Sequence, residues 1–247
     1  MRNIIIGDVH GCIDELKLLI KKCKLNEDDQ IYFLGDLINK GPNSLDVLNY
    51  VLFISEFYNV KLIIGNHELK FLRFINNKIN NPKALNQMKL RFDLYDLERN
   101  ISSSALDLLK LGYFSYRIPE IEVLLIHGGI TENCKLDFNI NYQYDSTSFK
   151  KSKELELLTM TRYLNNSGEF VAMGNENADY KFWAEEYDGR FGLILFGHQV
   201  FFESKPMFFK NAIGLDGGCV FGGYLFALIF EDNSKTLIKV KSLKKYL

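Results

Sequence analysis

The stretch LIIGNHEL, from Leu62 to Leu69, begins as an apolar strand and ends in three polar side chains. Gly65 and Asn66 are residue types that commonly occupy turns, so an ordinary strand end would explain them. Open α/β folds, however, bind their ligands at the carboxyl ends of their strands. The rest of the chain decides between these two interpretations.

The succession of strand, glycine, polar loop and helix occurs three times in the first 75 residues. Apolar strands that end at a glycine are predicted over residues 4–6, 31–34 and 60–64. Helices are predicted over residues 13–23, from about Ser44 as a plausible N-cap, and over the segment ELKFLRFI. Such alternation predicts βαβ units and a largely parallel sheet, which places the chain in the α/β class.

The remainder of the chain is less regular. Further strands are predicted over residues 122–126 and 193–196, and the glycine-rich segment 214–232 is typical of antiparallel β-structure. The polar, helix-prone segment of about 76–110 is a possible helical cap, and the segment 131–190 is the least informative. Without a repeat, linker or low-complexity tract, one domain over residues 1–247 is expected.

Composition excludes several classes of protein. The formal net charge is −1, from 30 basic and 31 acidic side chains, which argues against an extended nucleic-acid interface. No segment reaches the roughly 18 apolar residues of a membrane helix, and the apolar run at the N-terminus is too short for a signal peptide. The 4 cysteines form no CxxC pair. We therefore expect reduced thiols and a cytoplasmic protein.

The 4 histidines of the chain all follow strand-like apolar runs and lie next to glycine or within a glycine-flanked motif. A single histidine at such a place is usually structural, but core packing alone does not explain all of them. Asp8 and Asp36 occupy the same kind of position after Gly7 and Gly35. If the strands are neighbours, these side chains converge at one edge of a sheet, and the histidines involved are His10, His67, His127 and His198.

Aspartate, histidine and asparagine are oxygen and nitrogen ligands that suit manganese, iron, zinc or a similar divalent ion. The number of candidate ligands exceeds one tetrahedral site and suggests two metal ions that share a carboxylate. Such pairs of ions bind phosphoryl oxygens and activate water. Two divalent ions carry more charge than Asp8, Asp36 and one hydroxide together neutralise, so the site would attract a phosphate.

Five short motifs, in this order along the chain, resemble the metallophosphoesterase signature shared by the phosphoprotein phosphatases and their relatives. They are GDVHG at 7–11, GDLINKG at 35–41, GNHE at 65–68, HGG at 127–129 and GH at 197–198. Any one of them alone is a weak signal, and their combination is highly specific. The resemblance implies a four-layer α/β/β/α sandwich with two mixed sheets.

The resemblance also implies roles for individual residues. Asp36 would bridge two divalent metal ions, of which manganese is expected, with iron, zinc, cobalt and nickel as alternatives. His67 would be the general acid that protonates the leaving oxygen, with Asp36 its partner in the catalytic site. One ion would be held by Asp8, His10 and Asp36, and the other by Asp36, Asn66, His127 and His198.

Longer segments, such as GDVHGCIDELKLLIKK and GLDGGCVFGG, are similar to the bacterial symmetrical diadenosine tetraphosphatases. This similarity implies that Lys40, Arg162 and Asn66 contact substrate phosphate, although the family usually has arginine where Lys40 stands. Asn39 occupies a position where protein phosphatases usually have an aspartate beside the catalytic histidine. For Glu68 we prefer a simpler role, that of a carboxylate favoured by the dipole at a helix start.

The preferred function is symmetrical hydrolysis of diadenosine tetraphosphate to two ADP, and the alternative is a serine/threonine protein phosphatase with the same metal site. The substrate partner would therefore be a small dinucleoside polyphosphate or a phosphoprotein. A catalytically inactive binding module is disfavoured by the intact ligand set, and a nuclease by the missing basic stripe. Aromatic residues make up 14% of the chain, and the sequence does not indicate which of them stack on adenine.

Overall fold

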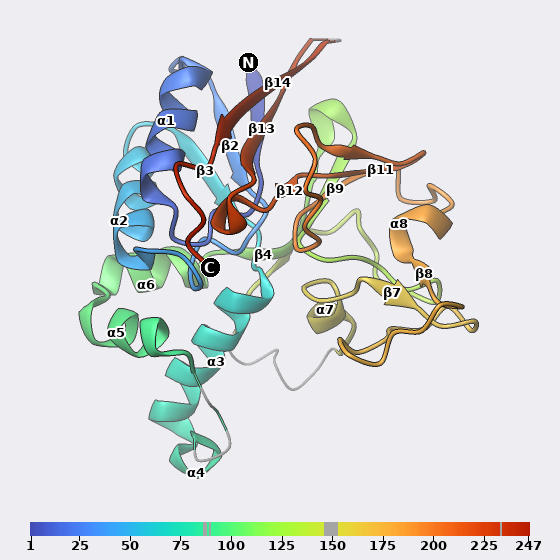
Figure 1. The fold of residues 1–247 in the computed structure, drawn as a ribbon, viewed down its shortest axis with the longest axis horizontal. Helices are drawn as coiled ribbons and strands as arrows, with labels where there is room; N and C mark the ends of the chain where they lie inside the picture. Colours follow the sequence, from blue (N-terminus) through green and yellow to red (C-terminus); the bar gives the residue numbers. More distant parts are fainter. Residues whose placement is uncertain (86–87, 89, 146–152, 233) are drawn as a thin grey trace.

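Two mixed β-sheets form the centre of the protein in a computed structural model that describes residues 1–85, 88, 90–145, 153–232 and 234–247 (Figure 1). The first sheet has the order β12-β13-β1-β2-β3, with β14 paired to β13. Its strands are β1 (Arg2–Ile6), β2 (Gln30–Phe33), β3 (Asn59–Leu62), β12 (Asp216–Gly217), β13 (Tyr224–Glu231) and β14 (Ser234–Lys241). The three predicted βαβ strands, β1 to β3, are parallel, whereas β13 pairs with β1 in the antiparallel direction.

The second sheet has the order β10-β11-β9-β5-β4-β6. Its strands are β4 (Tyr113–Ile118), β5 (Val123–Ile126), β6 (Tyr142–Gln143), β9 (Leu193–Phe196), β10 (Met207–Phe208) and β11 (Ala212–Gly214). A separate short pair is formed by β7 (Tyr163–Leu164) and β8 (Lys181–Phe182). The resemblance predicted two mixed sheets, and this prediction is confirmed.

Apolar side chains from both sheets meet between them. Ile5 and Leu228 from the first sheet share one buried cluster with Leu125, Leu195 and Ile213 from the second. Strand residues that point the other way, such as Ile4 and Ile126, belong to a second cluster that includes helix residues. Because both faces of the central strands are buried, these strands are almost continuously apolar, as their sequences indicated.

Helices α1 and α2 lie against strands of the first sheet, α1 against β13 and β14 and α2 against β3. The helices are α1 (Ile13–Cys23), α2 (Ser44–Ser55), α3 (Asn66–Asn80), α4 (Pro82–Leu85), α5 (Phe92–Asn100), α6 (Ser103–Lys110), α7 (Lys153–Leu157) and α8 (Trp183–Glu186), with 3-10 turns at η1 (Pro119–Ile121) and η3 (Cys219–Phe221). No helix within the described ranges is both long and apolar enough to cross a membrane.

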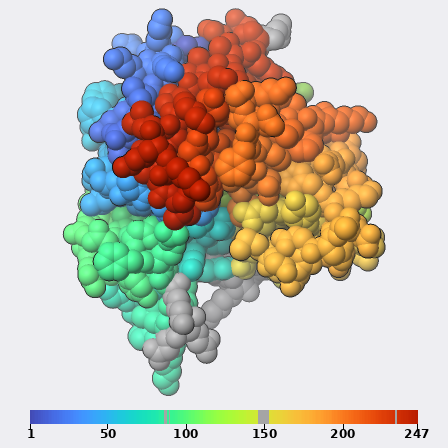
Figure 2. All heavy atoms as spheres, in the orientation of Figure 1, coloured from blue at the N-terminus to red at the C-terminus, as the bar shows by residue number. Residues whose placement is uncertain are grey.

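Some details differ from the sequence-based expectations. The N-cap of α2 is Asn43, whose side chain accepts the Asp46 N–H, and Ser44 is the first helical residue. Strand β4 was not predicted, because its sequence YFSYRI mixes polar and apolar residues. The segment expected to be a cap is helical where it is described, and Figure 2 shows part of it projecting from the body of the molecule. Residues 86, 87 and 89 of this segment, and 146–152 of segment 131–190, lie outside the described residues.

Residues 242–246 are hydrogen-bonded to α1 through one buried carboxylate. Glu15 is 0% exposed, and its Oε1 accepts hydrogen bonds from the Leu243 N–H and the Tyr246 hydroxyl, each at 2.9 Å. The Ser242 hydroxyl donates to the same oxygen at 3.3 Å. The C-terminal residues therefore lie against the N-terminal helix, as the adjoining red and blue atoms in Figure 2 show.

We predict that Tyr246→Phe lowers the free energy of unfolding by about 1–2 kcal/mol, since a hydrogen bond to a carboxylate is lost. Urea unfolding followed by circular dichroism measures the change. Tyr58→Phe is the matched control, because the Tyr58 hydroxyl makes no hydrogen bond within the described part of the chain. Equal unfolding curves for Tyr246→Phe and the wild type would contradict the prediction.

Candidate active site

Asp36 lies at the centre of a cluster of histidines at the carboxyl ends of the strands. The chain places Asp36 just after β2, where it is 1% exposed. Its Oδ2 lies 3.4 Å from His10 Nε2 and 3.8 Å from His67 Nε2. Its Oδ1 lies 3.4 Å from His127 Nε2. The segments after β1, β3 and β5 thus each bring a histidine to the carboxylate that follows β2. The side chains converge, but β5 belongs to the second sheet, so they come from two sheets and not from one sheet edge as expected.

Two groups of possible metal ligands share Asp36. Within each group the ligand atoms lie within 4.8 Å of one another. The first group is His10, Asp36 and His67, and the second is Asp36, His127 and His198. Asn66 adjoins the second group, since its Oδ1 lies 3.3 Å from His127 Nε2. Oxygen and nitrogen donors of this kind fit divalent ions such as manganese, iron or zinc.

Asp8 is in the site but outside both of these groups. Its carboxylate is 3% exposed and accepts the backbone N–H of His198, at 3.2 Å to Oδ1 and 3.1 Å to Oδ2. Asp8 therefore links the loop after β1 to the loop after β9. In this arrangement it fixes the backbone of one candidate ligand, and the role of Asp8 as a ligand stays a prediction.

The loops that carry these residues have unusual backbone conformations. The φ angles of His10, Asp36 and His198 are 46°, 50° and 66°, in the left-handed region that most residues avoid. Such conformations persist where the surrounding structure fixes them, and they are frequent at functional sites. A side chain at Gly35 would come within 2.7 Å of His127 Nδ1, so glycine is needed there for close approach of the loops.

The cluster strongly perturbs the titration of its members. Burial alone would raise the pKa of Asp36, but His127, His67 and His10 together hold it well below its usual value. Burial likewise opposes protonation of His127, but the facing Asp36 carboxylate raises its pKa to about 9. Asp36 is consequently ionised, the form in which a carboxylate binds a metal ion.

Burial dominates at the other histidines. It lowers the pKa of His10 to about 3 and that of His67 to about 4, and it lowers the pKa of His198 well below its ordinary value. These imidazoles are therefore neutral at pH 7. A neutral imidazole has the free nitrogen lone pair that a metal ligand needs.

Glu68 does more than the helix-start role that the sequence indicated. It is 0% exposed in the first turn of α3, where it accepts the Gly65 N–H. The same carboxylate also accepts the backbone N–H of Asp36 at 2.7 Å and that of Ile38 at 3.2 Å. Glu68 thus connects the start of α3 to the loop after β2, and its hydrogen bond to the Asp36 N–H holds the backbone of Asp36 in position.

Asp216 is a member of the site that the sequence analysis missed. It is 3% exposed. Burial raises the pKa of both Asp216 and Asp8, and the negative charge of Asp216 raises the pKa of Asp8 further. Its Oδ1 accepts the Gly218 N–H at 2.9 Å. Asp216 follows the apolar run that ends at Leu215, as Asp8 and Asp36 follow theirs, and this shared pattern was the available signal.

The two predicted phosphate-binding cations lie beside different members of the cluster. Lys40 Nζ is 2.9 Å from His10 Nε2, and the Lys40 backbone N–H donates to Asp93 Oδ2 of α5 at 3.0 Å. Arg162 Nη2 donates to the His198 carbonyl at 3.0 Å. Arg162 directly precedes β7. A positive group is therefore available next to each of the two ligand groups.

Asn39 makes no hydrogen bond to His67 among the described residues. The Asn39 side chain accepts the Lys40 N–H at 2.7 Å. His67 Nδ1 is buried and has no hydrogen-bond partner among the described residues. The ring of His67 is therefore oriented by packing, including an edge contact with the His10 ring at a centroid distance of 5.0 Å.

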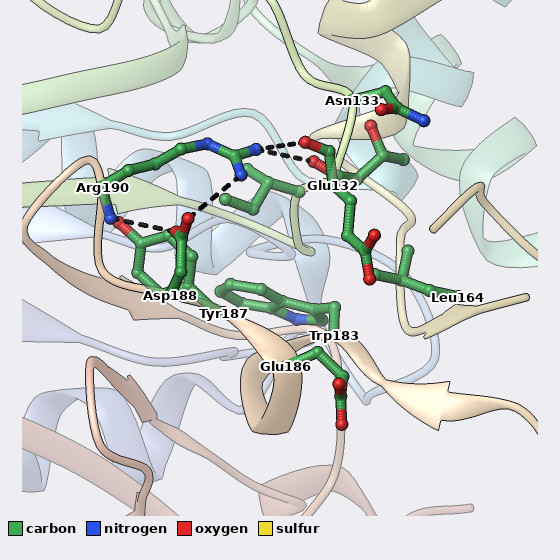
Figure 3. Close-up of a pocket in the computed structure, with 10 residues that line it drawn as sticks. Glu132, Asn133, Leu164, Trp183, Glu186, Tyr187, Asp188 and Arg190 are labelled. Atoms are coloured by element: carbon green, nitrogen blue, oxygen red, sulfur yellow. Dashed lines mark hydrogen bonds and ion pairs between the residues drawn. The ribbon is translucent and has the colours of Figure 1, made fainter. Parts of the chain in front are cut away.

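A cavity of about 310 Å³ adjoins the loop after His127 (Figure 3). Its lining includes the carboxylates of Glu132, Glu186 and Asp188. The guanidinium of Arg190 is engaged within the wall, by the Thr131 and Glu132 carbonyls and by Asp188. The carboxylates would repel phosphate, so this cavity is chemically distinct from the histidine cluster.

Such a set of aspartate and histidine donors, at the strand ends of two mixed sheets, is that of a metal-dependent hydrolase acting on phosphoesters. The chain belongs to the calcineurin-like phosphoesterase family, whose sequence model matches residues 1–202. The match includes all five motifs and ends after the last histidine.

The chain is similar over nearly all of its length to two kinds of tetraphosphatase. One is bis(5'-nucleosyl)-tetraphosphatase PrpE (asymmetrical) from Oceanobacillus iheyensis, 29% identical over 100% of this chain and 95% of the relative. Another is the symmetrical bis(5'-nucleosyl)-tetraphosphatase of Escherichia coli O1:K1, 30% identical over 94% of this chain and 92% of the relative.

Solved structures have the same fold. The crystal structure of a candidate diadenosine tetraphosphatase has a TM-score of 0.70 and 26% identity, and the match covers 96% of this chain and 93% of that one. A serine/threonine phosphatase from Saccharomyces cerevisiae has a TM-score of 0.64, at 16% identity over 99% of this chain and 81% of that one. At this low identity, the second likeness concerns the fold alone.

We predict that Glu68→Gln weakens metal binding by roughly 10–100-fold, because Glu68 supports the backbone of Asp36 and its replacement amide cannot accept all three N–H groups. Titration of the stripped protein with manganese, followed by calorimetry, measures the affinity. Glu120→Gln is the matched control, at an exposed acidic residue in η1. Unchanged affinity in Glu68→Gln would show that Asp36 does not depend on this support.

Proposed function

We propose that the protein hydrolyses a phosphoanhydride bond of a dinucleoside polyphosphate, converting diadenosine tetraphosphate and one water molecule into two ADP. The observation that carries the proposal is the position of the two cations. Lys40 lies beside His10 and Arg162 lies beside His198, so one cation adjoins each of the two ligand groups that share Asp36. A chain of phosphates would use both cations, whereas a single phosphate needs fewer contacts.

The cluster would hold two divalent cations, with manganese the first candidate. The metal ions supply Lewis-acid stabilisation of the phosphoryl oxygens and lower the pKa of the attacking water. Asp36 would bridge them. Asp8 and His10 would complete one site, and the other would be completed by Asn66, His127 and His198.

The remaining residues would bind the substrate and move a proton. Arg162 presents a planar fork that suits two phosphate oxygens, and Lys40 presents a point charge. His67 would donate a proton to the oxygen of the departing ADP. An anionic phosphate beside the ring raises the pKa of His67, since an opposite charge favours the protonated form.

The relatives support a tetraphosphatase, and their names include both modes of cleavage. We favour the symmetrical mode, which produces ADP alone, because the longer motifs are similar to that branch. The described cysteines are unpaired, as expected in a reducing compartment, and we propose a cytoplasmic enzyme with a small-molecule substrate.

Product analysis by chromatography tests the proposal. The manganese-loaded protein is offered diadenosine tetraphosphate and, separately, a phosphothreonine peptide. ADP as the sole nucleotide product is expected. ATP with AMP would establish asymmetrical cleavage, and release of phosphate from the peptide with the dinucleotide intact would establish a protein phosphatase.

We predict that His67→Asn slows hydrolysis of diadenosine tetraphosphate by roughly 10²–10⁴, as expected when a general acid is lost. Metal content should be retained, because the remaining members of the cluster still provide ligands. p-Nitrophenyl phosphate is the comparison substrate, since its leaving group needs no proton, and its turnover should fall much less. An equal loss with both substrates would assign His67 to binding and not to proton transfer.

A further inference from the structure

Two exposed apolar side chains lie next to the two cations of the site, and the first belongs to a pair of phenylalanines. Phe202 is 71% exposed, and its ring packs against that of Phe221 at a centroid distance of 6.2 Å and an interplanar angle of 70°. Lys40 Nζ lies over the Phe221 ring, 5.7 Å from its centroid. The Phe202–Phe221 pair therefore adjoins the cation that contacts His10.

The pair is attached to the site by short stretches of chain. Phe202 follows His198 by four residues, which is at most about 14 Å of extended chain. Phe221 is in η3, which Gly218 separates from β12, the strand that contains Asp216. A side chain added at Gly218 would approach the Phe202 ring to 3.1 Å, so the backbone of this loop supports the ring from one side.

The second apolar side chain adjoins the other cation. Met173 is 81% exposed, and its Sδ lies 3.5 Å from Arg162 Nη1. An exposed apolar group is thus found near each cation: Phe202, which packs on the Phe221 ring below Lys40, and Met173, which contacts Arg162. Single exposed apolar residues are common on protein surfaces, but these two adjoin the two cations of the site, and that placement suits a ligand in which apolar and anionic parts alternate.

We infer that these groups bind the two bases of the substrate: one base stacks on the Phe202–Phe221 pair, and the other contacts Met173. The inference rests on the proposed function and extends it to specificity. A dinucleoside polyphosphate has an anionic chain with a planar aromatic ring at each end, which matches cations flanked by apolar surfaces. Stacking on aromatic side chains tolerates any base, and a methionine sulfur makes favourable contacts with ring edges.

The cavity of Figure 3 fits this ligand less well. Its lining carboxylates, Glu132, Glu186 and Asp188, would oppose the phosphates that must accompany the base. The Phe202–Phe221 pair has a lysine next to it instead, so base and phosphate would be bound by neighbouring groups.

Steady-state kinetics and calorimetry test the inference in the manganese-loaded enzyme. For diadenosine tetraphosphate, Phe202→Ala should raise KM by roughly 5-fold or more, from the loss of one stacked base. Met173→Ala should raise it by about 2- to 10-fold. Phe202→Trp should restore a KM near that of the wild type, because an aromatic face is again present.

Phe57→Ala is the matched control. Phe57 is 62% exposed and pairs edge-on with Phe53, as Phe202 does with Phe221. It lies beyond the C-terminal end of α2, about 18 Å along the helix from the end near Lys40. This variant should behave as the wild type.

Calorimetric titration with ADP and with pyrophosphate separates failure of the inference from failure of the proposed function. Wild type should bind ADP more tightly than pyrophosphate, and Phe202→Ala should lose most of this preference. Hydrolysis of the dinucleotide with KM unchanged in Phe202→Ala would overturn the inference and leave the proposed function intact. Equal affinity of the wild type for ADP and pyrophosphate would overturn the inference that a base is bound, whatever the substrate. If the wild type prefers ADP, and this preference depends on Phe202, but the enzyme does not hydrolyse the dinucleotide, only the proposed function would be overturned.

Discussion

The site depends on one buried carboxylate held in a fixed position. Asp36 has a left-handed backbone, its N–H is bound by Glu68, and its Oδ1 accepts the His67 N–H at 3.1 Å. Three imidazoles face it within 3.8 Å. The histidines that follow strands β1, β3 and β5 all face this carboxylate, and their proximity keeps it ionised. The two sheets provide the rigid base from which these short loops extend.

Much of the fold and site could be predicted because strand ends have a local signature. An apolar run, a glycine and a polar residue recur at 4–8 and 31–36, and parallel strands bring such ends together. The resemblance to metallophosphoesterases then predicted a second sheet, which the alternation of strands and helices did not predict. The distances around Asp36 agree with the predicted convergence of the histidines.

The parts that were missed depend on contacts between distant segments. Glu68 was interpreted from its place at a helix start, but its partners Asp36 and Ile38 come from another loop. Strand β4 is stabilised by its neighbours β5 and β6 and has no clear apolar alternation of its own. Asn43 rather than Ser44 caps α2, because the Ser44 hydroxyl accepts the Asn39 N–H. Local residue preferences contain no information on such pairings.

The position of β1 has a consequence for how the chain is made. This first strand lies between β2 and β13, so one of its edges is covered only by a segment near the other end of the sequence. Glu15 of the helix that follows likewise bonds to residues 242–246. During folding, the segment that contains β1 and α1 therefore keeps an unpaired strand edge and an unpartnered carboxylate until residues 224–246 pack against it. Folding of the loop after β1 is therefore coupled to docking of a segment about 220 residues later, and a chain without β13 would leave one edge of β1 uncovered.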